Sequence, residues 1–249
     1  MPAGRHLHNV SLMLFPGPLV RGTLLKRYQR FLADVRLDDG SEITASCPNT
    51  GTMMGLSDPG AIIWLSRSVS PTRKYAHCWE LVEHDVGHGA SMVGINTGLP
   101  NKIVEEALSA GVVPELAGYP SLRREVRYGV NSRIDLLLER LPGDRCYLEI
   151  KNVHLSRTPG LAEFPDCVSA RAAKHLVELS DMVREGHRAV MVYLIQRGDV
   201  GRFQLAADLD PTYAAGFASA RAAGVEMLAY VCEVTTGGVT LARRIPIAD

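Results

Sequence analysis

The feature of the sequence that most restricts its fold is a change of pattern near residues 90–98. Before it, short strand-like runs follow one another closely and are separated by turns such as Asp38-Asp39-Gly40. After it, apolar runs alternate with segments of helical spacing. Closely spaced strands are typical of a small antiparallel barrel, whereas alternating helices and strands are typical of an α/β sheet. The sequence therefore predicts a β-barrel followed by an α/β domain.

The predicted elements give each half a more definite architecture. Strands of the first half are expected at residues 20–28, 31–37, 42–47, 61–66 and 75–83, a number that fits an OB-type barrel. In the second half we expect helices at 101–110, 171–184 and 211–223, and strands at 122–128, 133–139, 146–153, 189–196 and 225–231. This order predicts a mixed sheet. We assign residues 1–18 to an N-terminal extension, 19–95 to the barrel and 96–249 to the α/β domain.

Positive and negative charges balance over the whole chain. Lys+Arg and Asp+Glu both number 27, so the formal net charge is zero. A protein that coats nucleic acid through its overall charge has a clear cationic excess, and the balance counts against that class. A localised basic groove beside an acidic metal site is still compatible with zero net charge.

Several features point to a cytoplasmic protein. The five cysteines are widely scattered and include no C-x-x-C pair, which is the pattern of reduced thiols. The N-terminus lacks the long apolar region and cleavage site of a signal peptide. No apolar stretch approaches the roughly 20 residues that a transmembrane helix needs. We therefore expect no membrane partner.

The strongest candidates for a catalytic site lie in the strand-like run from Cys146 to Val153. Alternate residues of a strand share a face, so Glu149 and Lys151 point to the same side. A turn at Leu141-Pro-Gly-Asp144 precedes this strand, and Asp135 and Glu149 are each seven residues from Pro142. A hairpin centred there places Asp135 opposite Glu149, with Cβ atoms about 4.5–5.5 Å apart.

Two carboxylates so close repel each other unless a cation lies between them. A hard divalent ion resolves the repulsion, because Mg²⁺ binds one or two carboxylates, keeps several waters and contacts substrate phosphate. Lys151 could then orient the attacking water or stabilise the charge that develops on phosphorus. A structural ion pair between Glu149 and Lys151, or a solvated sheet face, is the alternative interpretation. The apolar neighbours of Asp135 count against a fully solvated strand.

These residues resemble a known signature and a known family. Asp135 followed by Glu149-Ile-Lys151 is similar to the Asp…Glu-x-Lys motif of restriction-endonuclease-like nucleases. The chain from about Leu19 to Ile245 resembles the sugar fermentation stimulation protein A family. The segments that carry this second resemblance are Lys26–Val35, Cys47–Gly51, Arg73–Tyr75, Asn101–Ala107, Phe164–Asp166, Lys174–Leu176 and Gly224–Glu226.

The resemblance implies an N-terminal OB-type domain, a C-terminal nuclease-like domain and DNA binding. It also implies that Asp135, Glu149 and Lys151 occupy metal-site positions, and that Glu106 matches an acidic helix residue of many superfamily members. Residues 1–18 fall outside the resemblance.

Basic, aromatic and loop residues elsewhere are candidates for nucleic-acid contact. Interleaved rings and cations on a barrel strand suit base stacking and phosphate contact, although strand packing explains the same pattern. A Pro-Asn-Thr-Gly loop could bind phosphate through its amides and hydroxyl, or be a plain turn. Basic residues three apart on a helix share a face, which could also be merely solvated. The candidates are Lys26, Arg27, Tyr28, Arg30, Asn49, Thr50, Arg73, Lys74, Arg171 and Lys174.

Two functions fit these observations best. The first is a DNA-binding phosphodiesterase that depends on Mg²⁺ or Mn²⁺, with Asp135 and Glu149 as metal ligands supported by Glu106, and Lys151 as the assisting cation. The second is a non-catalytic DNA-binding regulator of sugar-metabolism genes that keeps the nuclease fold. RNA is an alternative partner to DNA, and no motif indicates an oligomeric state. A weaker possibility is a barrel that binds a protein or small ligand beside a structural domain.

Overall fold

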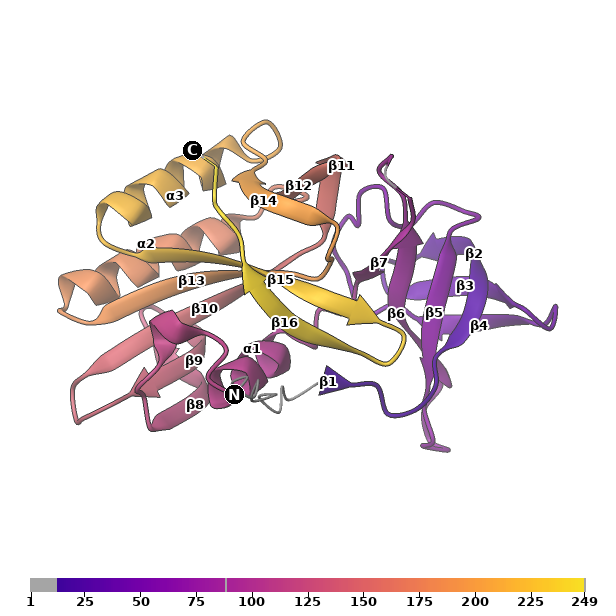
Figure 1. Ribbon diagram of the computed structural model, residues 1–249, viewed down its shortest axis with the longest axis horizontal. Coiled ribbons are helices and arrows are strands. Elements are labelled where there is room, and N and C mark those ends of the chain that lie inside the picture. Colours follow the sequence, from indigo (N-terminus) through magenta and orange to yellow (C-terminus); the bar gives the residue numbers. More distant parts are fainter. Residues whose placement is uncertain (1–12, 88, 249) are drawn as a thin grey trace, which may run out of the picture.

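A closed barrel forms the first part of the computed structural model, which describes residues 13–87 and 89–248 (Figure 1). Within these residues its strands are β2 (Val20–Tyr28), β3 (Leu32–Leu37), β4 (Glu42–Ser46), β5 (Ile62–Arg67) and β6 (His77–His84). They pair in the order β4-β3-β2-β5-β6, and the Ser46–Cys78 contact between β4 and β6 closes the barrel. A further strand, β7 (Ser91–Gly94), pairs with β6 and leads into the second domain. The predicted OB-type barrel is therefore confirmed.

A mixed sheet forms the centre of the second domain. Its order is β1-β16-β15-β13-β10-β9-β8, in which β10, β13 and β15 run parallel and the outer pairs run antiparallel. The strands are β1 (Met13–Leu14), β8 (Ser121–Tyr128), β9 (Ser132–Glu139), β10 (Arg145–Val153), β13 (Arg188–Ile195), β15 (Glu226–Thr235) and β16 (Gly238–Arg244). The predicted mixed α/β domain is confirmed.

Helices cover both faces of this sheet (Figure 1). One face packs against α1 (Pro100–Ser109), and the short helix η1 (Pro114–Leu116) follows it. The other face packs against α2 (Ala170–Arg184) and α3 (Pro211–Ala222). No helix of the described residues is both long and apolar enough to cross a membrane.

Local sequence signals explain where α2 begins and which side it buries. The Ser169 hydroxyl accepts a hydrogen bond from the Ala172 amide at 3.2 Å and caps the first turn. Ala172, Leu176 and Leu179 recur at helical spacing and are buried against the sheet. Because the same stripe includes polar side chains, α2 also brings polar groups to the sheet surface.

Several strands were not predicted from the sequence. They are β1, β7, β16 and a small separate sheet of β11 (Leu155–Thr158), β12 (Gly160–Phe164) and β14 (Val200–Leu205). Most of these strands are short or pair with distant segments, as β12 does with β14, so local periodicity does not reveal them. β16 is different, because it has seven residues and forms a hairpin with β15. Met13 and Leu14, assigned to an extension, instead form β1 and pair with β16. The remainder of that predicted extension, residues 1–12, lies outside the described residues.

Candidate functional site

The β9–β10 hairpin brings Asp135 and Glu149 to the same level of the sheet. The ladder pairs Leu136 with Leu148, and the next position along the two strands sets Asp135 opposite Glu149. This is the register that a turn near Pro142 predicts. The two residues lie where the β9–β10 ladder ends, while β10 continues beside β13 to Val153.

Asp135 is held by two hydrogen bonds that come from different elements. Its Oδ2 accepts the backbone N–H of Ile150 at 2.8 Å, and its Oδ1 accepts the Asn101 amide of α1 at 2.9 Å. Burial and the nearby charge of Glu149 raise the pKa of Asp135 to about 6, against the lowering effect of these hydrogen bonds. The carboxyl therefore changes its charge close to neutral pH.

Glu149 is more deeply buried, with 3% of its surface exposed. Its Oε1 accepts a hydrogen bond from Lys151 Nζ at 2.7 Å and lies in close contact with His175 Nδ1. Burial disfavours the charged form, but the contacts with His175 and Lys151 outweigh it and lower the pKa of Glu149. Its Oε2 is buried and has no hydrogen-bond partner among the described residues.

His175 is a site residue that the sequence pattern did not predict. It projects from α2, and its Nδ1 lies 3.1 Å from Lys151 Nζ as well as against Glu149. The sequence contains a signal for it, because His175 lies between Ala172 and Leu179 on the buried stripe of an amphipathic helix. A polar residue at such a position needs a buried partner.

Tyr128 and Glu178 extend the polar cluster beyond the predicted residues. The Tyr128 hydroxyl and Glu178 Oε2 are buried without a hydrogen-bond partner in the described part of the chain. Burial and the negative charges of Glu149, Glu178 and Asp135 raise the pKa of Tyr128 above its ordinary value. The phenol therefore keeps its proton and faces an acidic environment.

Glu106, which the sequence analysis assigned to the metal site, lies apart from this cluster. Its Oε1 is 3.7 Å from Lys102 Nζ, and its side chain lines a small void beside Thr240 of β16. On α1 it is Glu105, four residues after Asn101, that shares the side facing the hairpin, and Glu105 is paired with Arg124. Among the described residues, no group of three or more His, Cys, Asp or Glu side chains is arranged to hold a metal ion.

Two of the predicted nucleic-acid residues have structural roles instead. The Arg27 guanidinium donates to the carbonyl groups of Arg30, Asn49 and Gly51 at 2.8–3.0 Å. Asn49 is 2% exposed, its amide donates to the Ile95 carbonyl, and its side-chain oxygen accepts the Gly51 N–H. Both side chains are used to build the Asn49 loop, because buried polar groups must be satisfied within the protein.

The other predicted contact residues remain at the surface or are partly engaged. Lys26 lies over the ring of Tyr28, whose hydroxyl donates to Asp34. Lys174 donates to the Val130 carbonyl at 2.7 Å and to Ser132. The exposed members of the set are Lys26, Arg30, Thr50, Arg73, Lys74, Arg171 and Lys174.

The two motifs Cys47–Gly51 and Phe164–Asp166 meet between the domains. Asp166 Oδ2 accepts the backbone N–H of Met53, which follows the first motif, at 3.0 Å. Gln196 provides a second connection, since its backbone carbonyl accepts the Gly94 N–H at 2.8 Å. The barrel is therefore attached to the α/β domain by specific hydrogen bonds.

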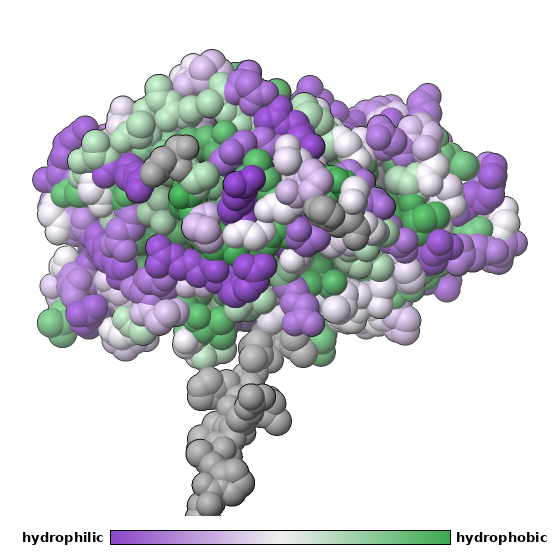
Figure 2. Space-filling model, turned by 45° about the horizontal axis from the view of Figure 1, so that its top comes forward, coloured by the Kyte–Doolittle hydropathy of each residue, from purple (hydrophilic) through white to green (hydrophobic). Residues whose placement is uncertain are grey.

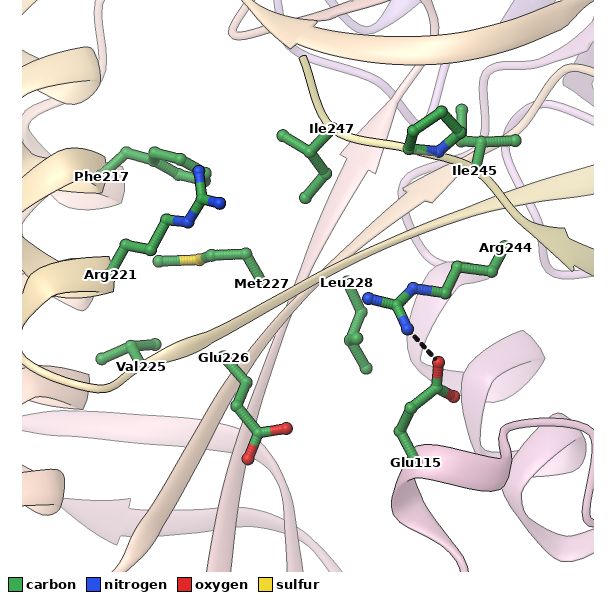
Figure 3. A pocket seen from close by; sticks show the side chains of 11 residues that line it. Glu115, Phe217, Arg221, Val225, Glu226, Met227, Leu228, Arg244, Ile245 and Ile247 are labelled. Atoms are coloured by element: carbon green, nitrogen blue, oxygen red, sulfur yellow. Dashed lines mark hydrogen bonds and ion pairs between the residues drawn. The ribbon is translucent and has the colours of Figure 1, made fainter. Parts of the chain in front are cut away.

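A hollow between α3 and the end of β16 is a less convincing site (Figure 3). Its Arg244 is paired with Glu115 at 2.7 Å, and its Glu226 is paired with Arg188 at 2.6 Å. These charged side chains therefore pair with each other and are not free to bind a ligand. On the face shown in Figure 2, hydrophilic residues are interspersed with apolar areas over both domains.

Comparisons with known proteins match both domains. Residues 25–95 match the family described as "SfsA N-terminal OB domain", and residues 98–238 match the "Sugar fermentation stimulation protein RE domain". Sugar fermentation stimulation protein homologs of Brucella ovis and Brucella melitensis are each 56% identical over 237 residues, covering 95% of this chain and 98% of theirs.

A solved structure, that of Pyrococcus furiosus SfsA in complex with Ca²⁺, has the same fold. It is 28% identical in sequence and superposes with a TM-score of 0.84 over 96% of this chain and 100% of that chain. Sequence and structure thus agree over both domains. The chain belongs to the sugar fermentation stimulation protein (SfsA) family.

Proposed function

We propose that this protein binds DNA and hydrolyses phosphodiester bonds with a divalent cation held by Asp135 and Glu149. The observation that carries the proposal is the pair of carboxylates at one end of the β9–β10 ladder, of which Glu149 Oε2 is buried without a partner among the described residues. Leaving an ionised oxygen buried and unpaired is costly, and a bound cation would remove that cost.

The donor set fits a hard cation. Asp135 and Glu149 supply carboxylate oxygens, and Mg²⁺ or Mn²⁺ sites of this type complete their coordination with water and substrate phosphate. The relative from Pyrococcus furiosus was solved in complex with Ca²⁺, which also prefers oxygen ligands. Glu106 is left out of the proposed ligand set, since its carboxylate lies beside Lys102 and β16.

The neighbouring side chains suit phosphoryl chemistry. When bound, the cation supplies Lewis-acid activation of water and phosphate. Lys151 lies on the same face as Glu149, so its ammonium can stabilise the negative charge that develops on a phosphate placed there. His175 contacts Glu149 and Lys151 together, and thereby fixes the orientation of both.

The barrel supplies a surface for the nucleic-acid strand. OB-type barrels bind oligonucleotides by combining cations with aromatic rings. Lys26 and Arg30 are exposed on and beside β2, and Arg73 and Lys74 are exposed between β5 and β6. These local positive charges support binding although the whole chain has no net charge.

The second candidate is a DNA-binding regulator without turnover. It is favoured by the contacts of Lys151, whose ammonium is held 2.7 Å from Glu149 and 3.1 Å from His175. A cation committed to an ion pair is less available to assist a water or phosphate. The two candidates differ in whether a divalent metal produces cleavage.

A cleavage assay tests the proposal. The purified protein is incubated with supercoiled plasmid and single-stranded DNA or RNA, in Mg²⁺, Mn²⁺ or EDTA. We expect metal-dependent nicking that falls by about 100-fold or more in Asp135→Asn and in Lys151→Ala. Lys102→Ala, whose side chain lies beside Glu106, is the control and should cut like the wild type. DNA binding without nicking in any metal would instead support the regulator.

A further inference from the structure

The tip of the β8–β9 hairpin carries two arginines that face each other. The register pairs Arg127 with Arg133, and both side chains are exposed. Directly opposed residues of antiparallel strands have Cβ atoms about 4.5–5.5 Å apart, and like charges at such positions are destabilising. Within the described residues, no carboxylate lies at ion-pair distance from either guanidinium.

The other arginines around this hairpin each lie beside a carboxylate. Arg123 and Arg145 both pair with Glu139, at 2.7 and 2.9 Å, and Arg124 pairs with Glu105. Arg140 lies 3.6 Å from Asp144. Each arginine at the base of the hairpin therefore lies beside a carboxylate, whereas neither arginine at the tip does so among the described residues.

The tip is held in place by α2. Glu178 Oε1 accepts the Val130 N–H at 3.2 Å and the Ser132 hydroxyl at 2.9 Å. Lys174 Nζ donates to the Val130 carbonyl at 2.7 Å. Gly129 has a positive φ of 52°, and a Cβ there would lie 2.9 Å from Glu178 Oε1. These contacts fix the position of the two arginines in advance of any ligand.

The tip also adjoins the carboxylate site. Arg127, Asn131 and Arg133 line an open hollow of about 510 Å³, together with Tyr128 and the neighbouring turn. Arg133 precedes Asp135 by two residues of β9, which corresponds to about 7 Å along the strand. A phosphate chain bound in this hollow would therefore lie near Asp135 along β9, although Asp135 does not itself line the hollow.

We propose that Arg127 and Arg133 bind the phosphodiester backbone of the nucleic acid beside the Asp135–Glu149 site. A planar guanidinium matches phosphate oxygens in bidentate geometry, and a polyanion between the two arginines removes their mutual repulsion. The inference rests on the proposed function, because it concerns the same nucleic acid.

Equilibrium binding of a fluorescent single-stranded DNA oligonucleotide to the full chain tests the inference. It is measured in EDTA, between 50 and 200 mM salt, so that no cleavage is needed. For Arg127→Ala/Arg133→Ala we expect binding weakened by about 10-fold or more, and a log–log salt slope shallower by about 1.4, roughly 0.7 for each lost phosphate contact. Arg123→Ala/Arg124→Ala removes the same charge from the same hairpin and should bind within about twofold of the wild type.

A second variant separates a binding role from a folding role. Arg133→Glu should pair with Arg127 across the hairpin, so we expect a Tm no lower than that of the wild type together with weakened binding. Wild-type affinity and salt slope in Arg127→Ala/Arg133→Ala, or equal losses in both double variants, would overturn the inference while leaving DNA binding intact. A wild-type protein that binds no oligonucleotide would overturn the proposed function as well.

Discussion

Asp135 is largely buried beside the negative charge of Glu149, so the folded protein favours its protonated form. The N–H of Ile150 and the amide of Asn101 offset part of the cost, yet its pKa is still raised to about 6. Glu149 keeps its charge with the help of Lys151 and His175. The metal-free protein therefore bears an unfavourable charge at neutral pH, at the position proposed to hold a cation.

The free energy of unfolding should depend on pH because of the Asp135 carboxylate. Above the unfolded pKa near 3.8 the folded state binds more protons at Asp135, so stability falls as pH rises to about 6 and is level beyond it. The difference in pKa corresponds to about 3 kcal/mol. In Asp135→Asn the amide oxygen still accepts the Ile150 N–H, and Asn101 can rotate to accept from the new amide.

We therefore expect Asp135→Asn to unfold at higher urea concentration than the wild type at pH 8 in EDTA. The gain should approach about 3 kcal/mol and disappear near pH 4, where Asp135 is protonated. Equal stability of the two proteins at pH 8 would contradict the raised pKa.

Helix α2 connects the cluster to the hairpin. It brings His175 to Glu149 and Glu178 to the hairpin tip, since residues three apart on a helix lie on one side. Its N-terminus is fixed through Asp210, the cap of α3. Asp210 is 2% exposed and accepts the Ser169 N–H and the Tyr213 N–H, both at 2.9 Å.

Asp210→Ala should therefore weaken two helix starts together. It leaves the buried Tyr213 N–H and the partly buried Ser169 N–H without their acceptor, and we expect a loss of about 2–3 kcal/mol in the free energy of unfolding. Asp210→Asn retains one acceptor oxygen and should lose about half as much. Denaturant titration followed by far-UV circular dichroism measures both, and a loss below about 0.5 kcal/mol in Asp210→Ala would contradict the shared cap.

The two domains act as one molecule through contacts of long sequence separation. Met53 is fully buried and donates its N–H to Asp166, 113 residues away. Around it, Asn49 and Arg27 use their polar groups to hold the barrel loop that meets the α/β domain. The attachment fixes where the barrel surface lies relative to the carboxylates.

Asp166→Ala should loosen this attachment. The buried Met53 N–H loses its acceptor, so we expect a destabilisation of about 1–3 kcal/mol and faster hydrogen exchange in residues 47–56. Asp166→Asn keeps an oxygen for Met53 and serves as the matched control. Exchange in this loop at the wild-type rate in Asp166→Ala would show that Asp166 does not hold the domains together.

Features of the fold that depend on local spacing can be predicted from the sequence. Strand alternation and turn length predicted the barrel strands, α2, and the register that sets Asp135 opposite Glu149, because these follow from neighbours within about 15 residues. The tertiary structure decided which polar groups meet. His175 contacts Glu149, Glu106 lies beside β16, and the Asn49 amide donates to the Ile95 carbonyl. Each of these contacts needs a partner from a distant segment, which sequence periodicity does not encode.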